Sequence, residues 1–422
     1  MFRRALGAMK YRSLNKLLGR ATQNDGEGFV AGQNLRAHLN ASFSSRNVRA
    51  FDCIELLETR IAPAVITAMW IGGDGNWDDP SHWDIGAVPN NGGGNTYHAV
   101  INVPGDAQIS INGSFTLDSI VNHEALFLRS GSMFNLAGSN SINEGLIQLQ
   151  YSPGSTRLTL GGTFTNDGTI RTEQTHGYGH LIGEIYLNAD TLIDGSGVIE
   201  MAAGSTPVIN GAADTELTLG ADQTLHGQGN INVPVINHGT LQADVSGWWL
   251  YTTAGVNNDG VLGAKSGGIL SLGGVACTTT KDIVAESGGV VRLLDTALEL
   301  NGKTLLADGG EVRLDHSAVA HGNVQVSDNT SSAVTLYNAV TFTLAPWVDG
   351  GAGYFLVPHS SAAVLGDRHI PAGVNLVISH SSSLDLSSPL RKDASRELSG
   401  GTPNADVILA SGSKSTTSNL RR

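Results

Sequence analysis

Short segments in which apolar and polar residues alternate recur at a fixed interval in the second half of the chain. They follow three equally spaced glycine pairs, Gly267-Gly268, Gly288-Gly289 and Gly309-Gly310. The period is about 21 residues, within the range of known solenoid repeats. The segments are Leu270-Ser271-Leu272, Val291-Arg292-Leu293 and Val312-Arg313-Leu314, and Val334-Thr335-Leu336 continues them after one inserted residue. Alternation at a fixed phase predicts one strand per repeat, with apolar side chains in an interior and polar ones in solvent.

A second recurring pattern is Asn-x-Gly in front of a strand-like segment. It occurs at Asn143-Glu144-Gly145, Asn166-Asp167-Gly168, Asn237-His238-Gly239 and Asn258-Asp259-Gly260. Because Asn and Gly tolerate positive φ, we expect these segments to form tight corners with left-handed backbone. We also expect Asn side chains on successive turns to form hydrogen-bonded ladders.

Together these patterns predict an all-β fold, a right-handed single-stranded parallel β-helix (solenoid). Residues 75–385 would form about 15 turns at this repeat length. An antiparallel β-sandwich uses similar turn residues and a similar alternation. It gives no reason for the constant spacing, so the β-helix is the favoured interpretation and the sandwich is the alternative.

The chain divides into four segments. Residues 1–66 form a basic leader or export segment, expected to be disordered or helical. Residues 67–90 form a Trp-rich N-terminal cap, because a solenoid exposes unpaired strand edges at its ends. Residues 91–388 hold the parallel β-helix repeats, and residues 389–422 form a polar, flexible tail.

Charge separates the leader from the rest of the chain. Residues 1–60 hold ten Lys and Arg and five Asp and Glu, so of 25 basic and 38 acidic residues the remaining 15 and 33 give a formal charge of −18. An acidic body lacks the positive face that neutralises phosphates, so we expect no nucleic-acid partner. Only 15% of the residues are charged and 54 are glycine, which fits repetitive β-structure better than a globular enzyme.

The two cysteines, Cys53 and Cys277, cannot provide a disulfide framework. Cys277 is interpreted as a small buried apolar residue. No run approaches the roughly 18 to 20 apolar residues of a spanning helix, so we expect no membrane span.

The segment Leu57-Glu58-Thr59-Arg60-Ile61-Ala62-Pro63-Ala64 follows basic residues and contains small residues spaced like a processing site. It resembles the LEPR-XLL-type leader segment near the N-terminus of large exported bacterial proteins. The residues that match are Leu57, Glu58, Arg60, Ile61, Pro63 and Ala64. The resemblance implies export to the cell surface or the medium.

Directly downstream the chain places, in this order, Trp70, Gly75-Asn76-Trp77, Trp83 and Gly86-Ala87-Val88-Pro89. This order resembles the opening of autotransporter-like β-helix passenger regions in bacterial surface proteins. That family usually has an acidic residue soon after the proline, where this chain has Asn90-Asn91. The resemblance implies a secreted or surface-located, adhesin-like β-helix.

A polysaccharide-active lyase or glycosidase is the main enzyme alternative, because such enzymes also use β-helices and need charged groups that converge on one face. The charged candidates are Asp295, Glu299, Glu311, Asp315, His316, Arg292 and Arg313. Their spacing is not specific, and Arg292 above Arg313 is also what an exposed strand position looks like. We therefore assign no catalytic residue.

Neither a metal site nor a cofactor site is predicted. The run Asp74-Gly75-Asn76-Trp77-Asp78-Asp79 begins like a calcium loop, but Asp79 replaces the required glycine and Ile85 the required glutamate. His176 and His180 are four apart, but the glycines between them disfavour a zinc-binding helix. Neither a phosphate-binding loop with a lysine nor a Gly-x-Ser-x-Gly elbow is present.

Trp248, Trp249 and Tyr251 are the candidate ligand-contact residues. Adjacent residues of a strand point to opposite faces, so at least one of the two Trp rings should be exposed. An exposed Trp can stack on a sugar ring or on a partner protein. Packing under a loop is the alternative.

We therefore expect a non-catalytic extracellular or cell-surface protein with a structural or adhesive role, whose lateral faces contact polysaccharide or other cell-surface components. The alternatives are a polysaccharide-active enzyme and a carbohydrate-binding module on the same scaffold.

Overall fold

The computed structural model describes residues 65–343, apart from residues 152–153, 175–182, 203–205, 328, 330 and 338–339, and five later strands. Of the predicted leader, only Val65 and Ile66 lie within the described residues. The predicted tail at 389–422 also lies outside them, except for one strand at Val407–Leu409.

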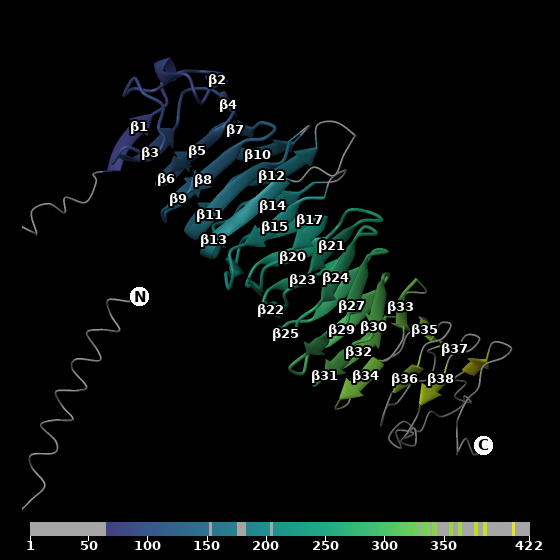
Figure 1. The fold of residues 1–422 in the computed structure, drawn as a ribbon. Helices are drawn as coiled ribbons and strands as arrows, with labels where there is room; N and C mark the ends of the chain where they lie inside the picture. Colours follow the sequence, from purple (N-terminus) through teal and green to yellow (C-terminus); the bar gives the residue numbers. More distant parts are fainter. Residues whose placement is uncertain are drawn as a thin grey trace, which may run out of the picture. The chain divides into compact units, whose positions relative to one another are not determined.

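Each turn of the fold contributes strands to three faces, and successive turns stack side by side (Figure 1). Every pairing between the described strands is parallel, as in the registers of the first, middle and last turns. The predicted parallel β-helix is confirmed, and the parallel pairing excludes the antiparallel sandwich.

The first face holds β1 (Val65–Met69), β3 (Thr96–Ile101), β6 (Ser119–Asn122), β9 (Ser141–Asn143), the second halves of β11 (Thr156–Asn166) and β13 (Gly183–Asp194), β16 (Leu217–Leu219), β19 (Val235–Asn237), β22 (Val256–Asn258), β25 (Cys277–Thr279), β28 (Ala297–Glu299), β31 (Ala318–Ala320), β34 (Val340–Thr343), β36 (Ala362–Val364) and β38 (Ser383–Asp385).

The second face holds β2 (Gly75–Asn76), β4 (Gln108–Ile111), β7 (Ala125–Leu128), β10 (Leu146–Tyr151), β12 (Thr169–Gln174), β14 (Val198–Met201), β17 (Thr224–Gly227), β20 (Thr240–Ala243), β23 (Val261–Ala264), β26 (Ile283–Glu286), β29 (Thr304–Asp308) and β32 (Asn323–Val326).

The third face holds β5 (Ser114–Leu117), β8 (Met133–Leu136), the first halves of β11 and β13, β15 (Val208–Gly211), β18 (Gly229–Ile231), β21 (Trp249–Thr252), β24 (Ile269–Gly273), β27 (Val290–Leu294), β30 (Glu311–Asp315), β33 (Ala333–Tyr337), β35 (Tyr354–Val357), β37 (Asn375–Ile378) and β39 (Val407–Leu409).

The predicted interior row is present on the third face. Leu270 pairs with Val291, Val291 with Val312, and Val312 with Val334, and all four side chains are fully buried. The last step is one residue longer than the two before it, as expected from the single inserted residue. The polar residues between them, such as Arg292 and Arg313, point outward and pair in the same register.

Turn length varies more than the glycine pairs indicate. Along the second face, the step between the paired residues Leu225 and Leu241 is much shorter than the step between Ile170 and Ile199. The steps are equal only over part of this face, as at Leu241, Leu262 and Ile283. The 12 strands of this face form about 11 turns. The number expected from the sequence was about 15 turns, counted over residues 75–385.

Three tryptophans fill the first turn. Trp70, Trp77 and Trp83 are at most 2% exposed, and the rings of Trp77 and Trp83 meet edge to face at 4.7 Å. The segment after the short 3₁₀ helix η1 (Pro80–His82) contacts the end of β1: Met69 N donates to Asp84 Oδ1 at 2.7 Å and Asp84 N donates to Met69 O at 2.9 Å. These bonds occupy backbone groups that another strand would otherwise pair with.

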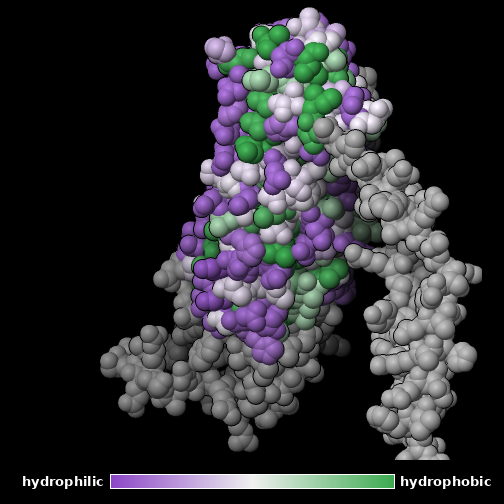
Figure 2. Space-filling model, turned by 90° about the vertical axis from the view of Figure 1, so that its left-hand side faces the viewer, coloured by the Kyte–Doolittle hydropathy of each residue, from purple (hydrophilic) through white to green (hydrophobic). Residues whose placement is uncertain are grey.

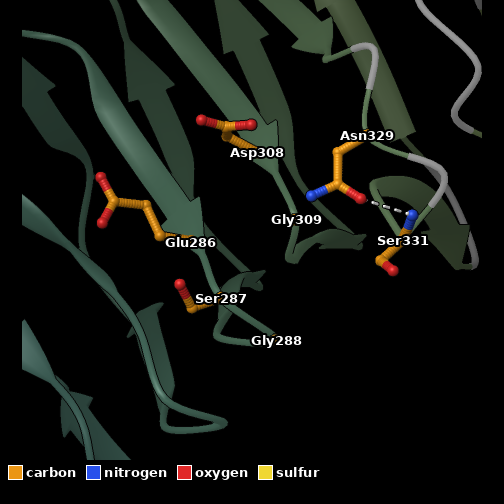
Figure 3. Close-up of a pocket in the computed structure, with 7 residues that line it drawn as sticks. All are labelled: Glu286, Ser287, Gly288, Asp308, Gly309, Asn329 and Ser331. Atoms are coloured by element: carbon orange, nitrogen blue, oxygen red, sulfur yellow. Dashed lines mark hydrogen bonds between the residues drawn. The ribbon is translucent and has the colours of Figure 1, made fainter.

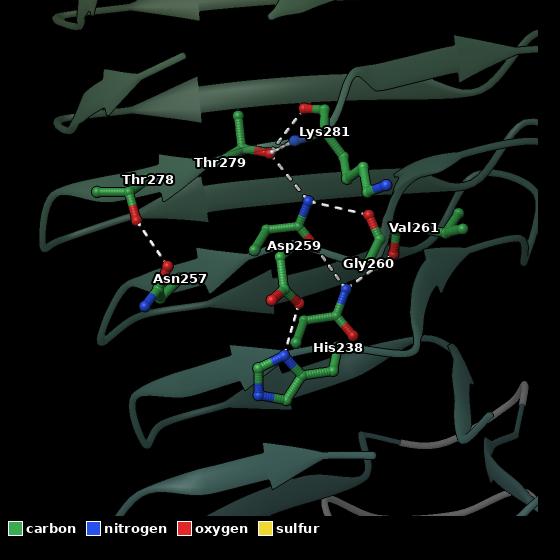
Figure 4. Close-up of polar contacts among 10 residues, drawn as sticks. His238, Asn257, Asp259, Gly260, Val261, Thr278, Thr279 and Lys281 are labelled. Atoms are coloured by element: carbon green, nitrogen blue, oxygen red, sulfur yellow. Dashed lines mark hydrogen bonds and ion pairs between the residues drawn. The ribbon is translucent and has the colours of Figure 1, made fainter. Parts of the chain in front are cut away.

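The predicted asparagine ladders are present at the corner between the first and second faces. Asn122 donates to Asn143 and Asn143 to Asn166, each at 2.8 Å, and in a second ladder Asn237 donates to Asn258 at 2.6 Å and Asn258 to Thr279 Oγ1 at 2.9 Å (Figure 4). The side chains of these residues are fully buried. Apart from Asn237 Oδ1, which has no partner among the described residues, the ladders satisfy polar groups that the stacked corners remove from water.

We expected the Asn-x-Gly corners to need glycine for a left-handed backbone with positive φ, and this expectation is wrong. Gly145, Gly168, Gly239 and Gly260 do not have positive φ. A Cβ at each of them would instead lie 2.0–2.2 Å from a backbone oxygen of the preceding turn. Positive φ occurs in the glycine pairs, where Gly267, Gly288 and Gly309 have φ of 77°, 78° and 71°. The Asn-x-Gly corners thus need glycine because successive backbone turns approach closely.

Candidate functional site

The candidate aromatic residues lie on the third face, at and just before β21. Trp248 and Trp249 are 49% and 46% exposed, which confirms that at least one of these rings is exposed. Trp248 precedes the strand and Trp249 begins it, so alternation does not send one of them inward. Tyr251 is partly exposed and follows on the same outward side.

The Trp249 ring is held against a cation from two turns further along. The Arg292 guanidinium lies 5.3 Å from the ring centroid, within the range of a cation–π contact. Arg292 Nη2 in turn donates to Asp315 Oδ2 at 2.8 Å. The Tyr251 ring lies against Gly273, because a Cβ at this glycine would be 2.8 Å from the ring. Both aromatic side chains are therefore supported by the turns that follow.

A second charged pair lies beside the first on this face. Arg313 Nη2 donates to Glu311 Oε2 at 2.8 Å, and Thr335 Oγ1 donates to Glu311 Oε1 at 2.6 Å. The hydrogen bond to Glu311 raises the pKa of the Arg313 guanidinium above its ordinary value. We call the following set the aromatic face: Trp248, Trp249, Tyr251, Ser271, Arg292, Glu311, Arg313 and Asp315.

Two buried polar atoms of the aromatic face have no hydrogen-bond partner in the described part of the chain. Ser271 is fully buried between Tyr251 and Arg292 in the strand register, and its Oγ is unpaired. Arg313 Nε is buried and unpaired two turns further along. Unpaired buried polar atoms are uncommon in folded proteins and mark a place where a further partner would be stabilising.

Of the other charged candidates, His316 reaches the edge of this set and Glu299 lies apart from it. Asp295 and His316 lie at the corner after the third face, where His316 Nδ1 is 3.8 Å from Asp295 and 3.4 Å from Asp315. Glu299 lies on β28 of the first face and accepts a hydrogen bond from His321 at 2.6 Å. The structure therefore brings together Arg292, Glu311, Arg313 and Asp315, already paired, with His316 and Asp295 at their edge, and leaves Glu299 elsewhere.

A polar pocket of about 540 Å³ lies where strands of the second face end. Its lining residues are Glu286, Ser287, Gly288, Asp308, Gly309, Asn329 and Ser331. Glu286 and Asp308 are neighbours in the register of β26 and β29 and are both exposed. In Figure 3 the Glu286 carboxylate is turned away from Asn329 and Ser331 on the other side of the pocket. Sequence reasoning missed this pair, whose only signal was an acidic residue shortly before two of the three glycine pairs, Gly288-Gly289 and Gly309-Gly310.

A second pocket, of about 510 Å³, follows the Asn-x-Gly corners and includes His238, Asp259 and Lys281. His238 Nδ1 lies 2.6 Å from Asp259 Oδ1 (Figure 4). Similar pairs join His123 to Glu144 at 2.9 Å and His226 to Asp244 at 3.0 Å. The two residues of each pair are about one turn apart in the sequence, which was the available signal for these pairs. Each pair links two successive turns.

Two of the three carboxylates of the calcium-loop-like segment, those of Asp74 and Asp79, accept hydrogen bonds. Asp74 Oδ1 accepts from Gln108 N at 2.8 Å, and Asp79 Oδ1 accepts from Ser81 Oγ and N at 2.6 and 2.9 Å. The bonds from Ser81 lower the pKa of Asp79. Within the described part of the chain, no group of three or more His, Cys, Asp or Glu side chains is placed to hold a metal ion. His176 and His180 lie outside that part.

Exposed apolar side chains also gather near the first turns, away from the aromatic face. They are Val65, Met69, Ile71, Ile85 and Met133. Figure 2 shows hydrophobic residues gathered toward the end of the solenoid that holds these turns, and a more polar surface below. No helix among the described residues has the length and apolar character required to cross a membrane.

The chain matches no protein-family model, no curated protein and no solved structure in the three comparisons made with known proteins.

Proposed function

We propose that this chain is a non-catalytic structural or adhesion protein, exported to the cell surface or the medium, whose β-solenoid presents lateral faces to other surface components. The LEPR-XLL-like segment at residues 57–64 and the autotransporter-like order of residues 70–89 support export. The parallel β-helix agrees with the scaffold that the second resemblance implies.

The observation that carries the non-catalytic part is the pairing of charged groups on the third face. Arg292 is bonded to Asp315 and Arg313 to Glu311, each at 2.8 Å. A glycosidase needs two carboxylates free to act on one bond, and a lyase needs a base facing its substrate. Here each carboxylate already accepts a hydrogen bond from a guanidinium, while the two Trp rings beside them are open to solvent.

Cell fractionation with identification of the mature N-terminus tests export. We expect the protein in the medium or at the cell surface, with its first residue downstream of residue 60. Recovery of a chain that starts at Met1, in the cytoplasm alone, would refute the proposal. Surface labelling of intact cells, with a cytoplasmic enzyme as the control for lysis, separates surface exposure from leakage.

A polysaccharide-active enzyme is the second candidate, because Glu286 and Asp308 bring two exposed carboxylates into one pocket. The test is incubation of the purified chain with neutral and acidic polysaccharides, followed by measurement of reducing ends. Release of product that Glu286→Gln and Asp308→Asn both abolish, and that Glu299→Gln on the first face does not, would establish catalysis. We expect no product.

A further inference from the structure

We propose that the aromatic face binds a neutral polysaccharide, with Trp248 and Trp249 as the stacking residues and Arg292 as a positioning residue. This inference rests on the proposed function, since it names the ligand that one lateral face would contact. It does not depend on the mode of export.

The first observation is the contrast among the tryptophans. Among the described ones, Trp70, Trp77 and Trp83 are buried to 2% exposure or less, whereas Trp248 and Trp249 are nearly half exposed. Two adjacent exposed Trp rings leave apolar area in contact with water, which is unfavourable unless a ligand covers it. Flat apolar rings fit the C–H faces of sugar rings, and the indole N–H supplies a donor at the edge.

The second observation is that the Trp249 ring is held in place before a ligand arrives. Arg292 contacts the ring at 5.3 Å and is itself fixed by Asp315 at 2.8 Å. Trp249 lies on a strand that is paired on both sides, with β18 and β24. A fixed ring loses little conformational entropy on binding, which favours its use as a ligand contact.

The third observation concerns hydrogen bonding. Two atoms of the aromatic face, Ser271 Oγ and Arg313 Nε, are buried without a partner among the described residues. Ser271 lies between Tyr251 and Arg292 in the strand register. Hydroxyl groups both donate and accept, so a sugar suits this mixture of guanidinium, carboxylate and serine groups better than an aliphatic ligand does.

The charges of the aromatic face favour a neutral polymer over an acidic one. The two guanidinium groups of the aromatic face are each bonded to a carboxylate, so Arg292, Arg313, Glu311 and Asp315 together carry no net charge. The whole chain has a formal charge of −13. A polyanion would meet no unpaired cation here and would be repelled by the body, whereas an uncharged polymer meets neither obstacle.

The test is affinity electrophoresis and calorimetry of the purified full chain with three neutral polymers, hydroxyethylcellulose, laminarin and galactomannan, and with polygalacturonate as the acidic one. We expect at least one neutral polymer to bind, and the affinity to be unchanged between about 0.05 and 0.5 M NaCl, where screening of charges changes strongly. Trp249→Ala should weaken binding about tenfold, which corresponds to about 1.4 kcal/mol.

Val261→Ala is the matched control, since Val261 is 55% exposed but lies on the second face; it should leave binding unchanged. Arg292→Ala should weaken binding less than Trp249→Ala and should increase acrylamide quenching of Trp fluorescence in the free protein. That change would be absent if Arg292 only stabilised the fold.

Failure to bind any of the three neutral polymers, or equal binding by the parent and Trp249→Ala, would overturn the proposal. So would salt-sensitive binding of polygalacturonate alone, and so would capture of a protein partner through Trp249 without any glycan. Each of these outcomes leaves the export test untouched, so the two proposals fail separately.

Discussion

Replacement of Asn258 by alanine tests the ladder that joins the corners of successive turns. The Asn258 side chain accepts from Asn237 at 2.6 Å and donates to Thr279 Oγ1 at 2.9 Å and to Gly260 O at 3.2 Å. A buried hydrogen bond contributes about 0.5–1.5 kcal/mol net, so three bonds give roughly 1.5–4.5 kcal/mol.

Two of the three groups that are hydrogen-bonded to Asn258 keep another partner in the variant. The expected loss of unfolding free energy therefore lies near the middle of that range. Asn237 Nδ2 still donates to Val261 O at 2.9 Å, and Thr279 Oγ1 still donates to Lys281 O at 2.7 Å. We therefore expect Asn258→Ala to lower the free energy of unfolding by about 2–3 kcal/mol.

The preceding residue provides a matched control. Asn257 is exposed, and its side chain accepts a hydrogen bond from Thr278 Oγ1 at 2.9 Å. Asn257→Ala should change the free energy of unfolding by less than about 0.5 kcal/mol, as is usual for surface substitutions.

Urea unfolding followed by far-UV circular dichroism measures the difference between the two variants, and hydrogen exchange locates it. Because a solenoid is stabilised by contacts between neighbouring turns, the loss of protection should centre on β19, β22 and β25. If the two variants unfold within about 0.5 kcal/mol of each other, the buried ladder does not stabilise the corner and the reasoning fails.

Three further experiments test other features of the structure. Gly260→Ala should destabilise the fold, because the added Cβ would lie 2.1 Å from Gly239 O. Gly92→Ala is the control and should leave stability unchanged, because a Cβ at Gly92 would have no atom within 4 Å. Equal urea midpoints for the two variants would contradict the close approach of successive turns. Burial raises the pKa of Cys277, so this thiol should react with iodoacetamide far more slowly in the native chain than in urea, as peptide mass spectrometry would report; equal rates would place it in solvent. The His321 hydrogen bond lowers the pKa of Glu299 below its ordinary value of 4.5, so its contribution to stability is present above pH 4.5 and is lost as pH falls through the lowered pKa. Urea unfolding of the parent and Glu299→Gln should therefore differ most at higher pH and converge in acid, and a gap that widened in acid would refute this sign.

The features predicted well are those that repeat within a short stretch of sequence. The spacing of Leu270, Val291 and Val312 was enough to specify strands, interior row and parallel stacking, because a constant period has few structural explanations. Asn237 and Asn258 likewise occupy equivalent positions, and equivalent positions in a solenoid are neighbours.

Features that depend on how one turn meets the next were harder to predict. The glycine at position 260 is required by a backbone oxygen at position 239, which no property of its own turn reveals. The partner of Arg292 is Asp315, diagonal to it in the register, rather than the directly paired residue Arg313. The long turn that ends at Ile199 and the short one that ends at Leu241 carry no glycine-pair signal, so their registers became clear only from the strand pairings.

The equal length of the turns between Leu241 and Ile283 has a consequence for how such a chain changes over generations. Leu241, Leu262 and Ile283 are equivalent positions at equal spacing along the sequence. Recombination between them inserts or removes one whole turn while every neighbouring strand keeps its partner. The same event between Ile170 and Ile199 would insert a longer and differently shaped turn. This middle part is therefore where the solenoid can most readily be lengthened or shortened, and where a turn such as the one that carries Trp249 can be copied.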